Sequence, residues 1–214
     1  MDEYYSDTAC FTGHRRIPPD TVPEVQEQLR EAVKAAWDQG YRRFLCGGAL
    51  GFDTLAALAV LSLREMHREI QLVLVLPCAD QARYWSEKDR QAHASILQAA
   101  DLVVTLQEHY DPGCMHRRNL YLVDHASLCI CLLTQLSGGT LNTVRYAVRK
   151  DLRIWNLAIP AEERESSTLR EDVWNYTFTS PSVSANADTA TFRLMLPGKT
   201  AWKDISARFS KKHR

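Results

Sequence analysis

Long apolar runs and an excess of charge of one sign are both missing from this chain of 214 residues. No stretch approaches the roughly 20 consecutive apolar residues that a membrane-spanning helix needs. The chain opens on the acidic Met1-Asp2-Glu3, and no apolar region typical of a signal peptide follows. We therefore expect a cytoplasmic protein that makes no contact with a membrane.

The formal net charge is zero, because 26 basic residues balance 26 acidic ones. A domain that binds nucleic acid usually carries a basic surface, so this balance argues against such a partner, although it allows a local basic patch. The hydrophobic content of 45% and the charged content of 24% are ordinary for a globular protein. A chain of this length buries about 70% of its unfolded surface, so it needs neither disulfides nor a metal for stability.

The sequence also lacks the spacing of Cys and His residues that is typical of metal sites. No pair of Cys or His residues recurs at the spacing of a zinc site, so we expect no metal. Five of the six cysteines lie in or beside apolar runs, where a free thiol packs as a small hydrophobic group. These five are Cys10, Cys46, Cys78, Cys129 and Cys131.

Short apolar runs alternate with segments of helical periodicity along most of the chain. Such runs are typical of strands that are buried on both faces of a parallel sheet. The alternation predicts an α/β fold, a Rossmann-like doubly wound and mainly parallel sheet of about six strands with helices on both faces. The expected strands are 8–12, 43–46, 70–76, 101–106, 128–133 and 153–157, and the expected helices lie near 21–40, 53–61, 86–100, 115–126 and 138–150.

Three helix starts have recognisable capping residues. Thr21 and Glu24 have the spacing of a capping box, and Pro23 falls in the first turn of the same helix. Asp53 is expected to cap the second helix, and Ser86 the third.

The composition changes after Pro160, where charged and turn-rich stretches begin. We predict a nucleotide-binding domain over 1–160 and a C-terminal extension over 161–214. Within the extension, 173–178 and 191–196 predict the two strands of a hairpin, and 202–209 has the spacing of a short amphipathic helix. The simplest interpretation is a tail packed on the sheet edge, and a separate interaction element is the alternative.

Four clusters rich in glycine, hydroxyl and arginine side chains follow predicted strands or begin predicted helices, at 12–16, 47–53, 115–119 and 137–140. Ligands of open parallel sheets bind outside the carboxyl ends of the strands. Glycine allows a phosphate to approach the backbone, a helix start offers free N–H groups, and arginine binds phosphate with two parallel donors. The candidate ligand-binding residues are Thr12, Gly13, His14, Arg15, Gly47, Gly48, Ala49, Leu50, Gly51, Asp53, Trp85, Arg118, Asn119, Ser137, Gly138, Gly139 and Thr140.

Two common phosphate-binding fingerprints are absent from the sequence. There is no G-x-x-x-x-G-K-[ST] segment, and the glycines of 47–51 do not form G-x-G-x-x-G. A nucleotide would therefore be held by a different arrangement.

The segments 12–15, 47–53 and 138–140 resemble the YpsA-like branch of the SLOG superfamily, named for the DNA-processing protein SMF/DprA and the LOG ("lonely guy") enzymes. The resemblance covers about 8–157 and includes 81–85 and Asp101. It implies a Rossmann-like sheet that binds nucleotides or ADP-ribose-like ligands.

The LOG enzymes offer a more detailed comparison. The segment 115–119 resembles their Met-His-x-Arg-Lys stretch, so that Arg118 matches their functional arginine. Their Gly-Gly-x-Gly-Thr-x-x-Glu motif ends in a glutamate that serves N-glycosidic cleavage, and Thr143 stands at that position here. A threonine cannot act as that carboxylate, which argues against hydrolysis while leaving binding intact.

The sequence thus predicts binding or sensing of a nucleotide or nucleotide-derived ligand, such as an ADP-ribose-like or NAD-derived compound or a nucleoside monophosphate. The alternative is a phosphoribohydrolase (N-glycosidase) of the LOG type, with Arg118, Asp53 and Asp124 as candidate catalytic residues and His14 or His116 as acid or base. A module that processes single-stranded DNA is the least favoured hypothesis. No cofactor is expected besides the ligand, and a homodimer is an open expectation by analogy with proteins of this fold.

Overall fold

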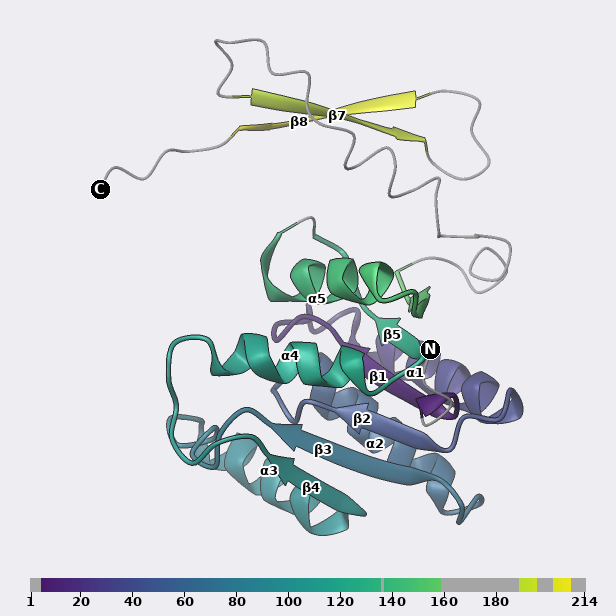
Figure 1. Ribbon diagram of the computed structural model, residues 1–214, viewed down its shortest axis with the longest axis vertical. Helices are drawn as coiled ribbons and strands as arrows, with labels where there is room; N and C mark the ends of the chain where they lie inside the picture. The colour runs from purple at the N-terminus through teal and green to yellow at the C-terminus, as the bar shows by residue number, and fades with distance from the viewer. Residues whose placement is uncertain (1–4, 136, 159–188, 196–201, 209–214) are drawn as a thin grey trace. The chain divides into compact units, whose positions relative to one another are not determined.

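The computed structural model describes residues 5–135, 137–158, 189–195 and 202–208 (Figure 1). The chain divides into two compact units, Met1–Ile159 and Pro160–Arg214. Among the described residues, no helix combines the length and the apolar character that crossing a membrane requires.

One parallel sheet of six strands forms the centre of the first unit (Figure 1). The strand order is β4-β3-β2-β1-β5-β6, and every neighbouring pair is parallel. This confirms the fold class predicted from the alternating apolar runs. The strands are β1 (Thr8–Thr12), β2 (Arg43–Cys46), β3 (Gln71–Leu76), β4 (Leu102–Thr105), β5 (Leu128–Cys131) and β6 (Arg153–Asn156).

Five helices cover the two faces of this sheet. The chain runs outward from β1 to β4 and then returns across the sheet to β5. Because parallel crossovers are right-handed, α1, α2 and α3 lie on one face and α4 and α5 on the other (Figure 1). The loops after the neighbouring strands β1 and β5 therefore leave toward opposite faces, which creates a topological switch point. The helices are α1 (Val22–Asp38), α2 (Phe52–Arg64), α3 (Glu87–Ala99), α4 (Cys114–Asp124) and α5 (Gly138–Arg149).

The core differs between the two faces of the sheet. On the face of α1 and α2, the fully buried ring of Phe11 lies 6.0 Å from that of Phe44 and 6.4 Å from that of Phe52. Successive side chains of a strand point to opposite faces, so Cys10 faces α4 and α5 together with its in-register partner Cys129. All six cysteines are free and buried, as the sequence predicts for the five in or beside strands.

The edge strand β4 departs from the expectation that both faces of every strand are covered. Leu102 is 55% exposed and Val103 39% exposed. Of the helices that the structure describes, only α4 and α5 cover the face opposite α1, α2 and α3. On the other face, α3 has a single buried residue, Ile96. Asp101, just before β4, accepts hydrogen bonds from the backbone of Leu72 at 2.8 Å and from Arg64 at 2.6 Å, which fixes the amino end of the strand.

The capping predictions were correct at one helix and wrong at two. The hydroxyl of Ser86 accepts the N–H of Asp89 at 3.2 Å, as predicted. The hydroxyl of Thr21 instead donates to the carbonyl of Pro18 at 2.9 Å, because Thr21 already has helical backbone angles and its side chain points away from the first turn. Gly51 precedes α2, so Asp53 belongs to the first turn of that helix and is not its cap.

In the second unit, β7 (Thr189–Met195) pairs with the antiparallel β8 (Trp202–Arg208). The helix predicted over 202–209 is therefore wrong. In so short a segment, apolar residues three positions apart are compatible with either a helix or a strand. The segment forms a strand because it pairs with β7. The strand predicted over 173–178 lies outside the described residues.

Candidate functional site

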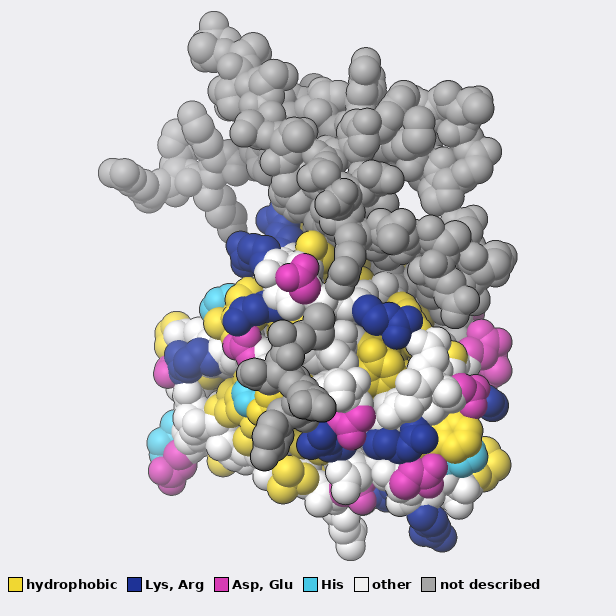
Figure 2. All heavy atoms as spheres, turned by 45° about the vertical axis from the view of Figure 1, so that its right-hand side comes forward, with side chains coloured by type: hydrophobic (Ala, Val, Ile, Leu, Met, Phe, Trp, Pro, Cys, Tyr) yellow, Lys and Arg dark blue, Asp and Glu magenta, His cyan; other side chains and the backbone are white. Residues whose placement is uncertain are grey.

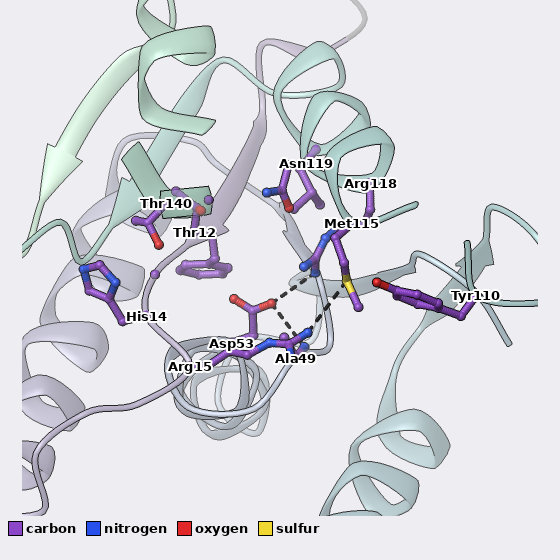
Figure 3. A pocket seen from close by; sticks show the side chains of 14 residues that line it. Thr12, His14, Arg15, Ala49, Asp53, Tyr110, Met115, Arg118, Asn119 and Thr140 are labelled. Carbon is purple, nitrogen blue, oxygen red and sulfur yellow. Dashed lines mark hydrogen bonds and ion pairs between the residues drawn. The ribbon is translucent and has the colours of Figure 1, made fainter. Parts of the chain in front are cut away.

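A cleft of about 430 Å³ opens at the carboxyl ends of the strands, next to the switch point between β1 and β5 (Figure 3). Its walls come from the turn after β1, the turn after β2, the first turns of α4 and the start of α5. The cleft is lined by Phe11, Thr12, Gly13, His14, Arg15, Ala49, Asp53, Tyr110, Met115, Arg118, Asn119, Leu122, Gly139 and Thr140.

An ion pair between Arg118 and Asp53 lies in this cleft (Figure 3). Nη1 of Arg118 is 3.2 Å from Oδ2 of Asp53, and each residue is only 6% exposed. The same Oδ2 accepts the N–H of Ala49 at 3.1 Å. The Nε of Arg118 has no hydrogen-bond partner among the described residues, although it is buried. An unmade hydrogen bond of this kind costs about 1–3 kcal/mol, so the guanidinium has capacity for a further acceptor.

Gly47 makes room for this ion pair. A Cβ atom at position 47 would lie 1.2 Å from Nη1 of Arg118 and 2.7 Å from Oδ2 of Asp53. Gly51 has a φ of +75°, and a Cβ there would lie 2.3 Å from the carbonyl oxygen of Arg15. These two glycines therefore allow close contacts within the protein, whereas the sequence suggested that they leave space for a phosphate. Neither of them lines the cleft.

The imidazole of His14 stands at one end of the cleft (Figure 3). Its Nε2 accepts the N–H of Thr134 at 3.3 Å, and partial burial lowers the pKa of the ring below its ordinary value. A neutral ring that accepts at Nε2 carries its proton on Nδ1. His14 therefore offers one N–H donor at neutral pH.

The start of α5 forms another part of the wall. Ser137 precedes the helix without a side-chain cap, and Gly139 and Thr140 line the cleft. The first N–H groups of a helix have no partner within the helix, and they carry the positive end of its dipole. The hydroxyl of Thr143, at the position of the LOG glutamate, donates to the carbonyl of Gly139 at 2.8 Å. Thr143 is buried and does not line the cleft, so it has a structural role.

Ten of the predicted ligand-binding residues come together in the cleft, and seven do not line it. Trp85 packs its ring edge-on against His93, with the centroids 5.1 Å apart. The carbonyl of Gly48 accepts the amide of Gln81 at 2.5 Å. The residues that do not line the cleft are Gly47, Gly48, Leu50, Gly51, Trp85, Ser137 and Gly138.

The candidate catalytic residues separate in the same way. Asp124 lies at the last turn of α4, where it binds the hydroxyl of Tyr146 and the ammonium of Lys150, each at 2.9 Å. It does not line the cleft, whereas Asp53 and Arg118 do. Among the described residues, no group of three His, Cys, Asp or Glu side chains is placed to hold a metal ion.

Four residues that line the cleft are not among the predicted ligand-binding residues, namely Phe11, Tyr110, Met115 and Leu122. Tyr110 lies at the mouth with 61% of its surface exposed, and its N–H donates to Asp80 Oδ1 at 3.0 Å (Figure 3). The sulfur of Met115 lies 3.8 Å from Nη2 of Arg15. An aromatic residue soon after a predicted strand, at the same edge as the polar clusters, was the available signal for Tyr110.

The family model YpsA, described as the YspA SLOG family, matches residues 19–155. The chain belongs to this family. This confirms the resemblance to the YpsA-like branch that the segments after β1, β2 and β5 carry.

Two relatives of this SLOG protein come from bacilli. The uncharacterized SPbeta prophage-derived protein YoqJ of Bacillus subtilis (strain 168) is 28% identical over 129 residues, which cover 54% of this chain and 75% of YoqJ. UPF0398 protein BH1768 of Halalkalibacterium halodurans is 29% identical over 121 residues, which cover 56% of this chain and 64% of that protein.

Two solved structures share the fold. DNA processing protein A (DprA) from Helicobacter pylori, described with a single-stranded DNA binding mode, has a TM-score of 0.51 at 19% identity, covering 70% of this chain and 64% of that chain. DprA from Streptococcus pneumoniae has a TM-score of 0.52 at 15% identity, covering 70% and 49%. The chain thus spans less than two thirds of BH1768 and of either DprA structure, and at these identities the likeness to DprA concerns the fold.

Proposed function

We propose that this SLOG protein binds a nucleotide or a nucleotide-derived ligand in the cleft, with a phosphate between Arg118 and the start of α5. The observation that carries the proposal is the buried Arg118 guanidinium, whose Nε lacks a partner among the described residues and which lines the cleft. Burying a charged group is costly, and a half-satisfied one is a candidate for binding an anion.

Asp53 fits the same ligand in a different way. Its contacts with Arg118 and Ala49 both use Oδ2, and none of the described hydrogen bonds uses Oδ1. A carboxylate oxygen can accept a hydrogen bond from a ribose hydroxyl, as an acidic residue about 20 positions after the glycine-rich turn does in Rossmann folds. Asp53 would therefore orient Arg118 through one oxygen and bind the sugar through the other.

Tyr110 and Met115 suggest where the base would lie. The exposed Tyr110 ring stands at the mouth of the cleft, held by the bond from its backbone to Asp80. Aromatic rings stack on planar heterocycles, and a thioether makes favourable contact with their edges. The end of the cleft near Tyr110 therefore suits a nucleobase.

A thermal-shift screen tests the proposal with AMP, ADP, ADP-ribose, cyclic ADP-ribose, NAD and other nucleoside monophosphates. A ligand present at 100 times its dissociation constant stabilises the folded state by about 2.7 kcal/mol, which raises Tm by about 5–10 °C in a protein of this size. We expect at least one such shift. A flat panel at millimolar concentrations would contradict the proposal.

The alternative function is N-glycosidic cleavage of the bound nucleotide. The observation that favours it is the buried Asp53 carboxylate in the cleft, since Thr143 cannot supply a carboxylate. The alternative predicts that a nucleoside monophosphate releases its free base in the presence of the protein and that Asp53→Asn abolishes the release. Binding without release assigns the cleft to binding alone.

A further inference from the structure

Strand β4 forms one edge of the six-stranded sheet, so within the described part of the first unit only β3 pairs with it (Figure 1). Just after β4, the N–H of Leu106 donates to the carbonyl of Leu76 in β3 at 3.0 Å. Alternate residues of a strand direct their N–H and C=O groups to the same side. The backbone groups of Val103 and Thr105 therefore point away from β3, where they can bond a further strand.

The side chains of this edge lack the features that usually prevent two edge strands from pairing. Natural edge strands carry charged residues or proline, which block the approach of another chain. The segment 102–106 is Leu-Val-Val-Thr-Leu, without a charge or a proline. Leu102 and Val103 are both exposed. The edge is thus an apolar strand that is open to a partner strand.

Helix α3 covers β3 and β4 next to this edge, and it is incompletely packed (Figure 1). Ile96 is its single buried residue. His93 marks the flank that faces the centre of the sheet, because its Cε1 would lie 3.4 Å from a Cβ atom at Gly48, in the turn after β2. The opposite flank, toward the open edge, has mostly small side chains at the helical spacing i, i+4, i+7 and i+11. Its residues are Lys88, Ala92, Ser95 and Ala99, and none of them is buried.

The segment 102–106 is complementary to itself around a two-fold axis at Val104. In an antiparallel pair centred there, Val103 lies opposite Thr105 of the second copy, so that the outward backbone groups of each bond the other. Leu102 lies opposite Leu106 of the second copy, and no like charges face each other. We infer that β4 pairs with β4 of a second copy of this chain, which joins the two sheets into one continuous sheet.

The same axis brings the α3 helices of the two copies together. Each α3 covers β3 and β4, so about two strand spacings, or about 10 Å, separate the two helix axes. Helices pack at about 8–10 Å, and small residues such as Ala92 and Ser95 allow this close approach. A pair of strands alone would make a small interface, and the pair of helices extends it toward the size that a stable dimer needs.

Charges at the two ends of this interface are complementary. Lys88 stands in the first turn of α3, at the carboxyl edge of the sheet, and Asp101 stands at the amino edge, just before β4. The antiparallel arrangement brings Lys88 of one copy to the end where Asp101 of the other copy lies. Asp101 accepts its bonds from Arg64 and Leu72 through Oδ2, and none of the described hydrogen bonds uses Oδ1. That oxygen can accept the lysine ammonium.

Sedimentation velocity of the full chain at several concentrations tests the inference. Ala92→Arg places a long charged side chain on the α3 flank that faces the second copy. Ala94→Arg is the matched control, because Ala94 is also exposed and lies about 200° around the same helix. Val103→Pro removes the outward N–H, a change that an edge strand tolerates. A cooperative thermal transition shows that each variant is folded.

We expect the wild type to sediment as a dimer of the 24.4 kDa chain. Ala92→Arg and Val103→Pro should each raise the dissociation constant of the dimer about tenfold or more, whereas Ala94→Arg should change it less than about threefold. A wild type that is monomeric at about 100 µM, or equal constants for the two arginine variants, would overturn the inference. So would a folded Val103→Pro variant that dimerises like the wild type, and if that variant does not fold, the two arginine variants decide.

Discussion

At the scale of single residues, the chemistry of the cleft depends on a contact that spans 65 positions of the sequence, between Asp53 and Arg118. The sequence marks both residues as candidates, Arg118 through the family resemblance and Asp53 through its place in a glycine-rich turn. It does not show that they pair, because the pairing follows from the return of α4 across the sheet. Nor does the sequence show that the missing side chain of Gly47 leaves the space that this ion pair occupies.

Replacing Gly47 with alanine should therefore destabilise the protein. The added methyl group would overlap the Arg118 guanidinium, and overpacking of this kind typically costs about 1–3 kcal/mol. Gly139→Ala is the matched control, because a Cβ atom at that position of the first turn of α5 would lie 4.0 Å from its nearest neighbour. Urea unfolding of both variants measures the difference. An equal stability of the two variants would contradict the role given to Gly47.

The two partly buried histidines predict how stability depends on pH. Burial lowers the pKa of His14 and of His93 below the ordinary value of 6.5. As the pH falls below 6.5, the unfolded chain takes up protons that the folded protein does not, so their contribution to stability is complete above pH 6.5 and is lost as the pH falls toward the folded pKa. The double variant His14→Gln/His93→Gln should flatten the rise of unfolding free energy with pH over this window.

The control for this measurement is His116→Gln, which changes an exposed histidine. The depressed carboxyl pKa of Asp111, which the hydrogen bond from Arg117 causes, acts at lower pH and is common to all variants. If the free energy of unfolding rises with pH as steeply in the double variant as in the wild type, burial of the two imidazoles does not contribute to the pH dependence of stability.

At the scale of elements, the periodicity of the sequence predicts the sheet well. All six strands and all five helices of the first unit occur where apolar runs and helical spacing place them. What the pattern misses depends on neighbours that are distant in sequence. Leu102 is apolar like the residues of the central strands, yet it is exposed because β4 lies at the edge. The segment beginning at Trp202 forms a strand because β7 pairs with it.

Local capping is the element-scale feature that mutation tests most simply. The hydroxyl of Ser86 accepts the Asp89 N–H and donates to the Asp89 carboxylate at 2.7 Å. Ser86→Ala should cost about 1 kcal/mol, the usual cost of losing a helix N-cap. Ser95→Ala in the same helix removes a hydroxyl bound to the carbonyl of Gln91 and should be neutral or slightly stabilising. Thermal unfolding followed by circular dichroism separates the two, and equal losses would contradict the capping role.

At the scale of the whole molecule, we propose that 1–160 is the nucleotide-binding domain and 161–214 an extension that the cleft does not need. Every residue that lines the cleft lies within Met1–Ile159. A chain that ends at Ile159 should bind the same ligands as the full chain, with affinities within about threefold, corresponding to about 0.6 kcal/mol. A truncated chain that folds but does not bind these ligands would show that the extension contributes to the site.

The charges on one face of the first unit bear on the kind of ligand that we propose. On the face drawn in Figure 2, basic and acidic side chains are interspersed, in keeping with a net charge of zero. A phosphate-binding surface for nucleic acid would concentrate Lys and Arg. The basic group on which the proposed site depends is a single buried arginine, which suits a small anionic ligand in a cleft.

A titration of wild type, Arg118→Ala and Arg117→Ala with the tightest ligand of the screen tests the role of that arginine. Arg117 precedes Arg118 on α4 but is exposed and paired with Asp111 at 2.7 Å, so it controls for loss of one positive charge. We predict that Arg118→Ala weakens binding about tenfold or more, as loss of a charged hydrogen bond requires, while Arg117→Ala changes it less than about threefold. Equal affinities of the two variants, with both folded, would show that Arg118 does not hold the ligand.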